Sequence, residues 1–273
     1  MAPYSVNSSL RLFVIPHSSL PCIMPILEFF YELFRKLIEE IRFRVFYGPV
    51  FHRFLNHRYT FYKALPRNDK VHFLKLVRDH YEYFEFVERQ MKLTRAMKAI
   101  ICSGASQLVM NLPPESLTFW ERIIVYPDDY ESQITHRMHK GEANPGLRTL
   151  VFSWRGIMQG LDRPDDGLNL LLHEFAHALW LEHKLRNESY AVLDEHLVNE
   201  FERLAHLEMK HLHANESHFF RKYAFANIEE FFAVAVENFF ERPGQFKMQL
   251  PHFYDVLSRM FAQEPHKLEV TKV

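Results

Sequence analysis

The sequence HEFAH at residues 173–177 constrains this chain more than any other feature. It lies in an apolar run that includes residues 170–172 and 178–180. On a helix, His173 and His177 are one turn apart on the same face, so both imidazoles can reach one ion. Glu174 projects beside them. Ionisable side chains in so apolar a helix are costly unless they are satisfied, and a metal ion would satisfy them.

The chemistry of this motif favours zinc. A catalytic zinc site takes three protein ligands and a water molecule, and neutral imidazoles are among its preferred ligands. Zinc lowers the pKa of the bound water towards about 7, and Glu174 could then accept its proton. The motif therefore predicts a zinc-dependent hydrolase with one zinc ion per chain. The competing interpretation is that His173, Glu174 and His177 lie on a partly exposed helix face and bind no metal.

The third ligand is less clear from the sequence. His183 occupies the third histidine position of an HExxHxxGxxH pattern, but Trp180 stands where that pattern has glycine. His183 would therefore reach the ion only if the helix ended early. The candidates near the motif are Glu182, His183, Asp194, Glu195 and His196.

A second apolar segment, NIEEFFAVAVEN at residues 227–238, offers another solution. It carries Glu229, Glu230 and Glu237, and a glutamate on a second helix is a common third zinc ligand. Glu230 could instead complete a capping box with Asn227 at the start of the helix. The residues alone leave both interpretations open.

Composition excludes several other functions. The chain has 33 Lys and Arg against 34 Asp and Glu, which argues against nucleic-acid binding because phosphate neutralisation needs a basic excess. Two cysteines cannot form a disulfide framework, and a reducing compartment, the cytoplasm, is expected. The 8 glycines provide little material for phosphate-binding loops.

The first part of the chain is predicted to be separate from the rest. Residues 12–27 carry no charge but contain three prolines, which disfavour a spanning helix. Apolar residues at spacings of three and four predict an amphipathic helix at 26–46, with core packing its expected use. Membrane contact through residues 1–46 is possible but not favoured. We expect a tail and amphipathic helix at 1–60 and a metallopeptidase domain at 61–273.

The remaining pattern predicts a mostly helical α+β fold. Helices are expected at 71–87 and 94–110, and β-branched runs predict strands at 122–126 and 148–154, separated by a polar loop. A turn at 164–167 precedes the motif helix, predicted at 168–184, with Asp165 or Asp166 as its N-cap. The sequence after this helix has mainly helical character.

Several blocks in order resemble the Mlc titration factor A family of zinc metallopeptidases. The blocks are 124–127 (IVYP), 139–142 (HKGE), 151–154 with 165–177 (VFSW and DDGLNLLLHEFAH), and 223–240. The resemblance covers roughly residues 65–265. It implies a peptidase of the gluzincin-like type, a hydrolase that acts on peptide or protein substrates.

The resemblance also implies roles for individual residues. His173, His177 and Glu230 match the metal ligands, and Glu174 matches the general base. Tyr223 matches a tyrosine that could hydrogen-bond the oxyanion of the tetrahedral intermediate. Glu237 is similar to a glutamate that orients a histidine ligand. Packing alone would be the ordinary role of Tyr223, and a salt bridge that of Glu237.

The implied fold is a zincin-like domain, distantly similar to the catalytic domain of anthrax lethal factor, with a small sheet packed against the HExxH helix. The strand at 148–154 would be an edge that binds an extended peptide. The alternative function is a regulatory protein-binding module that retains a structural zinc site. A regulatory protein partner is possible in either case.

Overall fold

The computed structural model describes residues 20–43, 45, 48–132, 136–186, 191–211 and 218–270. Most of the predicted N-terminal tail lies outside these residues. The chain divides into one unit at residues 1–47 and another at 48–273. The functional boundary expected at residue 60 stays a prediction.

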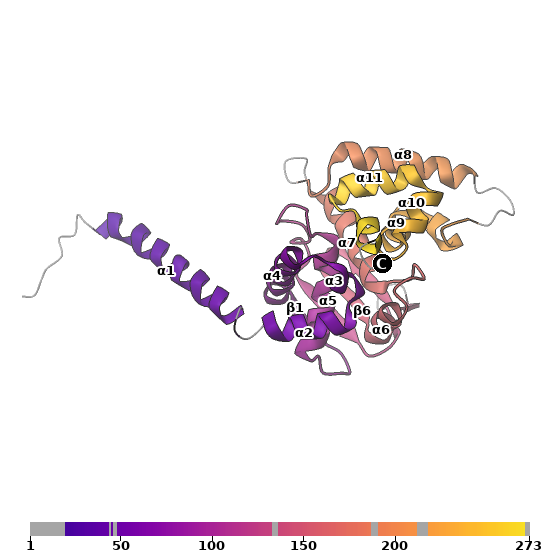
Figure 1. The fold of residues 1–273 in the computed structure, drawn as a ribbon. Coiled ribbons are helices and arrows are strands. Elements are labelled where there is room, and N and C mark those ends of the chain that lie inside the picture. The colour runs from indigo at the N-terminus through magenta and orange to yellow at the C-terminus, as the bar shows by residue number, and fades with distance from the viewer. Residues whose placement is uncertain are drawn as a thin grey trace, which may run out of the picture. The chain divides into compact units, whose positions relative to one another are not determined.

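The first unit contains helix α1 (Leu20–Arg42), coloured indigo in Figure 1. The expected helix is therefore present, although it begins earlier than residue 26. Within this unit taken by itself, Phe30, Phe34 and Leu37 are 59%, 63% and 53% exposed, and the core packing expected for this apolar face stays a prediction. Among the described residues, no helix is long and apolar enough to span a bilayer.

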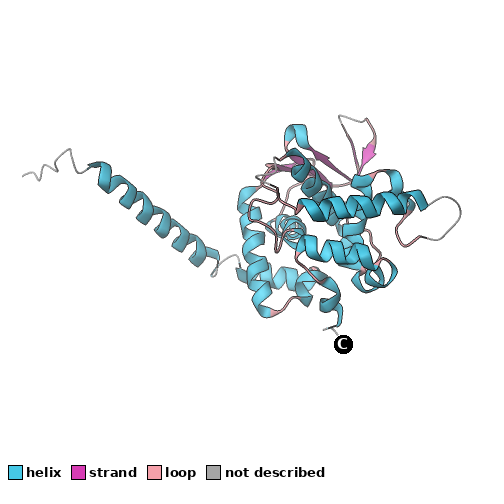
Figure 2. Cartoon of the chain, turned by 90° about the horizontal axis from the view of Figure 1, so that it is seen from above, coloured by secondary structure: helices cyan, strands magenta, loops and turns pink. Residues whose placement is uncertain are grey.

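The second unit is built on a four-stranded mixed sheet with the order β1-β2-β6-β5. Its strands are β1 (Glu85–Glu88), β2 (Arg122–Tyr126), β5 (Gly141–Asn144) and β6 (Thr149–Ser153). β1 and β6 run parallel to β2, whereas β5 runs antiparallel to β6. Figure 2 shows the strands gathered on one side of the helical body.

The position of β6 corrects the expected peptide-binding edge. β6 lies between β2 and β5, so both of its edges are paired. All five of its residues are buried, as is typical of an inner strand covered on both faces. The end strands of the sheet are β1 and β5, and β5 lies within the segment expected to be a loop. Its sequence, GEAN, lacks the β-branched residues that mark a strand, so only pairing with β6 reveals it.

The helix expected at 71–87 ends earlier than predicted. Helix α4 (Arg67–Tyr83) ends before residue 87, because Phe84 is extended and β1 follows it. The stretch at 84–87 is apolar enough to continue a helix, but its pairing with β2 makes it part of a strand. A short hairpin of β3 (Tyr130–Glu131) and β4 (Met138–His139) lies outside the sheet.

The helices confirm a mostly helical α+β fold. The motif helix, α7 (Leu170–Leu185), packs against α5 (Arg95–Leu108) and α9 (Ile228–Glu241). The large side chains Trp180, Phe201 and Phe232 fill the core where α7 and α9 meet α8 (Glu195–His211). The other helices are α2 (Gly48–Arg58), α3 (Thr60–Ala64), α6 (Trp154–Asp162), α10 (Pro243–Gln249), α11 (Pro251–Phe261) and α12 (Pro265–Val270).

The start of α7 differs from the prediction. Asn169 is the N-cap, and its side-chain oxygen accepts a hydrogen bond from the backbone of Leu172. Asp165 and Asp166 precede it in the turn, and Gly167 takes a positive φ of 73° there. This tight turn delays the helix by two residues and places His173 in its first full turn.

Candidate metal centre

Two helices bring three potential metal ligands together. His173 and His177 come from α7, and Glu230 comes from the first turn of α9. The Nε2 atoms of the two histidines are 3.1 Å apart. Oε2 of Glu230 lies 3.3 Å from Nε2 of His173 and 3.5 Å from Nε2 of His177. The three side chains are only 12–15% exposed, so the group is largely shielded from water.

This geometry fits a tetrahedral cation. Ligand atoms about 2.1 Å from a tetrahedral ion lie about 3.4 Å from one another, close to the observed spacing. Oε2 of Glu230 is also buried without a hydrogen-bond partner among the described residues, an arrangement that a cation would resolve. Among the residues that the structure describes, this is the one such group of three ligands.

The electrostatics of the group also favour a positive charge. Burial lowers the pKa of His173, but the carboxylates of Glu230 and Glu237 outweigh this effect and raise it to about 10. Burial raises the pKa of Glu230, but the two imidazoles outweigh it and hold that pKa well below its usual range. The carboxylates thus attract a cation to the point where the ligand atoms meet.

Both interpretations of residues 227–230 describe part of the structure. Asn227 is the N-cap of α9, and its side chain accepts a hydrogen bond from the backbone of Glu230. The side chain of Glu230 does not close a capping box, because it faces His173 and His177 instead. The cap therefore fixes the backbone while the carboxylate remains available to a metal.

Glu174 lies beside the ligand group and is only 6% exposed. Its carboxylate packs directly against Gly141 of β5, where an added Cβ would overlap with it. Burial raises the pKa of Glu174. A carboxylate with a raised pKa is a stronger base, which suits it to accept a proton.

Tyr223 reaches the group from a short 3-10 segment, η4 (Lys222–Ala226). Its hydroxyl donates a 2.8 Å hydrogen bond to Oε1 of Glu230, and its ring centroid lies 6.4 Å from that of His173. Tyr223 is 54% exposed, so a second ligand could approach its hydroxyl from solvent. Burial of the hydroxyl and the nearby Glu230 raise the pKa of Tyr223 to about 12, which keeps it protonated at neutral pH.

Glu237 contacts His173 from two turns beyond Glu230 on α9 and is 1% exposed. Its Oε1 lies 2.6 Å from Nδ1 of His173, and its Oε2 accepts a 2.9 Å hydrogen bond from the backbone of Asn169. A carboxylate on the far nitrogen of a ligand histidine fixes the ring orientation and leaves Nε2 free to bind a metal. Burial raises the pKa of Glu237, but hydrogen bonds from His173 and Arg221 outweigh it and lower that pKa.

Arg221 is a site residue that was not expected from the sequence. Its guanidinium donates hydrogen bonds to both oxygens of Glu237, at 3.0 and 2.7 Å, and one of 2.9 Å to the carbonyl of Gly167. Arg221 directly precedes η4 and lies 16 residues before Glu237 and 54 residues after Gly167. No sequence signal marks an arginine whose partners come from two other segments.

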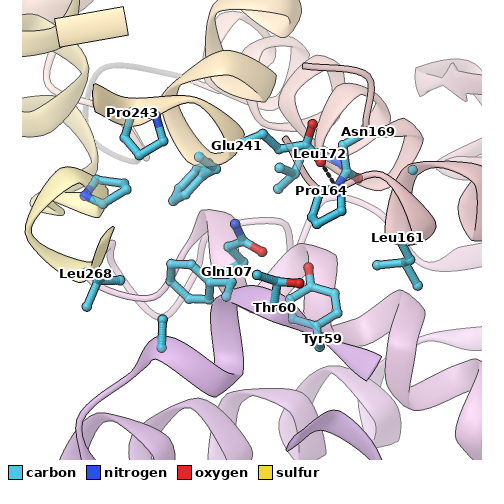
Figure 3. A pocket seen from close by; sticks show the side chains of 15 residues that line it. Tyr59, Thr60, Gln107, Leu161, Pro164, Asn169, Leu172, Glu241, Pro243 and Leu268 are labelled. Carbon is cyan, nitrogen blue, oxygen red and sulfur yellow. Dashed lines mark hydrogen bonds between the residues drawn. The ribbon is translucent and has the colours of Figure 1, made fainter. Parts of the chain in front are cut away.

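A further glutamate holds the loop before α7. Glu241, one turn after Glu237 on α9, accepts hydrogen bonds from the backbones of Gly167 and Leu168 and from the side chain of Asn169. Figure 3 shows Glu241 and Asn169 joined by their hydrogen bond at the wall of a small pocket behind α7. The N-terminus of the motif helix is therefore tied to α9 by two glutamates, Glu237 and Glu241, that lie one turn apart on the same helix face.

The other candidate ligands near the motif contact residues outside the ligand group. Glu182 is fully buried and pairs with Arg186 at 2.6 Å. His183 contacts Glu195 at 3.0 Å. Asp194 accepts hydrogen bonds from the backbones of residues 196 and 197 at the start of α8. The described structure brings none of these side chains into the ligand group.

A cleft beside the ligand group reaches His173 and Glu174. Its lining includes residues of β4, β5 and α6 together with His173, Glu174, Arg221 and Tyr223. The first ligand histidine, the candidate base and the tyrosine thus face one shared space.

Comparisons with known proteins agree with this geometry. The family model described as glucose-regulated metallo-peptidase M90 matches residues 42–262. An uncharacterized protein of Synechocystis sp. is 28% identical to this chain over 192 residues, an alignment that covers 63% of this chain and 68% of that protein.

Proposed function

We propose that this chain, which belongs to the family of glucose-regulated metallo-peptidases M90, is a zinc-dependent peptidase that hydrolyses peptide bonds. Family membership confirms the resemblance described above, while the similarity to lethal factor stays a prediction. The observation that carries the proposal is the convergence of His173, His177 and Glu230 beside the buried carboxylate of Glu174.

In this proposal, the two histidines and Glu230 hold the metal. A zinc ion at this position supplies Lewis acidity, which polarises a carbonyl group and lowers the pKa of a water molecule. Glu237 accepts a hydrogen bond from Nδ1–H of His173 and so keeps Nε2 directed at the metal. The choice of zinc rests on the two imidazoles and one carboxylate, a donor set typical of catalytic zinc sites.

Glu174 moves the proton. Its carboxylate would accept a proton from the attacking water and pass it to the nitrogen of the leaving amine. Burial raises the pKa of Glu174 and so brings it closer to the pKa values of the groups with which it exchanges the proton. Contact with Gly141 holds the carboxylate at the wall of the cleft.

Tyr223 would stabilise the charge that develops on the carbonyl oxygen. Its hydroxyl donates to Glu230 in the structure, so it must turn from this acceptor to the substrate oxygen. The 54% exposure of the side chain leaves room for that movement. A single donor of this kind contributes on the order of 10²–10³-fold to the rate in acyl-transfer enzymes.

An extended peptide could lie along β5. This strand ends the sheet, and its first residue, Gly141, touches Glu174. A peptide that added to this edge would gain backbone hydrogen bonds next to the candidate base. β5 thus takes the role expected for the strand at 148–154.

The test combines metal analysis with turnover. We expect one zinc ion per chain in the parent and loss of zinc in Glu230→Ala. Glu229→Ala is a matched control, because Glu229 is an exposed neighbour on the same turn and should leave the zinc content unchanged. Glu174→Gln should retain zinc but lose hydrolysis of a peptide library by at least about 10²-fold. Full turnover by Glu174→Gln would contradict the peptidase mechanism and favour the regulatory alternative.

A further inference from the structure

The carboxylate of Glu237 has all of its acceptor positions occupied. Oε1 contacts Nδ1 of His173 at 2.6 Å and accepts from Nη2 of Arg221 at 2.7 Å. Oε2 accepts from the backbone of Asn169 at 2.9 Å and from Nη1 of Arg221 at 3.0 Å. Arg221 therefore supplies two of the four contacts, in the parallel fork geometry that fixes the plane of a carboxylate.

Arg221 also supplies a permanent positive charge in direct contact with Glu237. Glu237 is 1% exposed, and its neighbours Glu174 and Glu230 are acidic. A buried carboxylate close to other carboxylates needs a positive charge beside it to remain ionised. The guanidinium meets this need without binding the ligand atoms, because its nearest approach to His173 is 3.4 Å, at the nitrogen that faces away from Glu230.

The same guanidinium joins three segments of the chain. Arg221 precedes the 3-10 segment that carries Tyr223, and its guanidinium lies 6.0 Å from the centre of the Tyr223 ring. Its hydrogen bond to the carbonyl of Gly167 reaches the loop before α7, and its bonds to Glu237 reach α9. One side chain thus connects the elements that carry His173, Glu230 and Tyr223.

We infer that Arg221 is a positioning residue of the metal centre, which acts through Glu237 to hold His173 in its metal-binding orientation. The inference rests on the proposed function only in assuming that His173 binds zinc. Arg221 is no catalytic residue in this scheme, since its donors are directed to Glu237 and Gly167.

The inference is tested by zinc affinity, measured by competition with a chromophoric chelator in the full chain. Arg221→Met should weaken zinc binding about 10–100-fold, the usual effect of removing a partner behind a ligand histidine. Arg221→Lys should fall between this variant and the parent, because lysine keeps the charge but cannot form the fork. Arg242→Met is the matched control, because Arg242 lies nearby but binds Asn238 instead of Glu237, and it should leave zinc affinity unchanged.

A double-variant cycle separates positioning from general stability. If Arg221 acts through Glu237, adding Arg221→Met to Glu237→Gln should change zinc affinity less than about threefold. The thermal unfolding of each zinc-free variant is recorded alongside. Independent, multiplicative losses in the double variant, or parent-like affinity in a folded Arg221→Met, would overturn the inference. A parent that binds zinc but hydrolyses no peptide would count against the proposed function alone.

Discussion

At the scale of single residues, Gly141 shows how closely the sheet approaches the site. A Cβ at this position would overlap with the carboxylate of Glu174. We therefore expect Gly141→Ala to displace Glu174 and to lower kcat roughly 10–100-fold, because small errors in the position of a catalytic group have effects of this size. Zinc content should not change, since the three atoms nearest the added methyl group all belong to Glu174, which is not one of the ligands.

Gly146→Ala provides the control for this prediction. A methyl group there meets only Oδ1 of Asn144, at 3.5 Å, which is an ordinary contact. Peptide hydrolysis by this variant should match the parent. If Gly141→Ala retained parental kcat, Glu174 would not depend on β5 for its position.

The individual site residues differ in how far the sequence could reveal them. His173, Glu174 and His177 follow from helical periodicity alone, because one turn separates the histidines. Glu230 lies 53 residues after His177, and its role became an expectation only through the family resemblance. Arg221 was missed because its partners, Glu237 and Gly167, meet it only after the chain has folded.

At the scale of elements, the contact between α5 and α7 sets the position of the motif helix. Gly104 of α5 faces α7 so closely that an added Cβ would lie 2.8 Å from Cβ of Leu171 and 3.3 Å from the ring of Phe175. Gly104→Ala should destabilise the protein by about 1–3 kcal/mol, as overpacked cores do, despite the higher helix propensity of alanine. Denaturant unfolding measures this change.

Gly156→Ala in α6 is the matched helical substitution. Its added Cβ meets the end of a flexible side chain, Cδ2 of Leu170, which can move aside. It should therefore cost less stability than Gly104→Ala. Equal losses for the two variants would show that the close approach of α5 and α7 is not the cause.

The contact between α4 and α5 should make stability depend on pH. Nδ1 of His80 lies 2.9 Å from the hydroxyl of Ser106, which itself donates to the carbonyl of Cys102, so His80 acts as the donor. Burial lowers the pKa of His80 to about 4, despite the opposing charge of Asp79. Because the folded pKa lies below the unfolded value of about 6.5, this stability is complete above pH 6.5 and is lost as the pH falls towards 4.

His80→Gln should flatten this dependence. The parent is expected to lose roughly 1–3 kcal/mol more than the variant between pH 7 and pH 4.5. The exposed His57 on α2, changed to Gln, serves as the control and should leave the slope unchanged. Parallel stability curves for the parent and His80→Gln would rule out His80 as a source of the acid sensitivity.

The elements also differ in how well their sequences predict them. β2 was predicted at its observed bounds, and β6 within one residue at each end, because both contain local runs of β-branched and apolar residues. β1 and β5 were missed, since their strand character comes from pairing with β2 and β6. Sheet order is likewise non-local, which is why the peptide-binding edge was assigned to the wrong strand.

At the scale of the whole molecule, α1 differs from every helix of the second unit. Large apolar side chains cover much of its described surface and are 41–68% exposed, including Phe29, Phe30, Phe34 and Ile38. Soluble monomers rarely expose a contiguous apolar patch of this kind. The family match begins at residue 42, close to the end of this helix.

We therefore expect residues 42–273 to retain the fold and the metal centre without α1. The unfolding midpoint and zinc content of this shorter chain should equal those of the full chain, and its solubility should be higher because the exposed apolar face is gone. Calorimetry, metal analysis and solubility measurements on both chains test this. A shorter chain that unfolds several degrees earlier would show that α1 packs against the second unit in solution, whereas equal solubility would show that its apolar face is already covered.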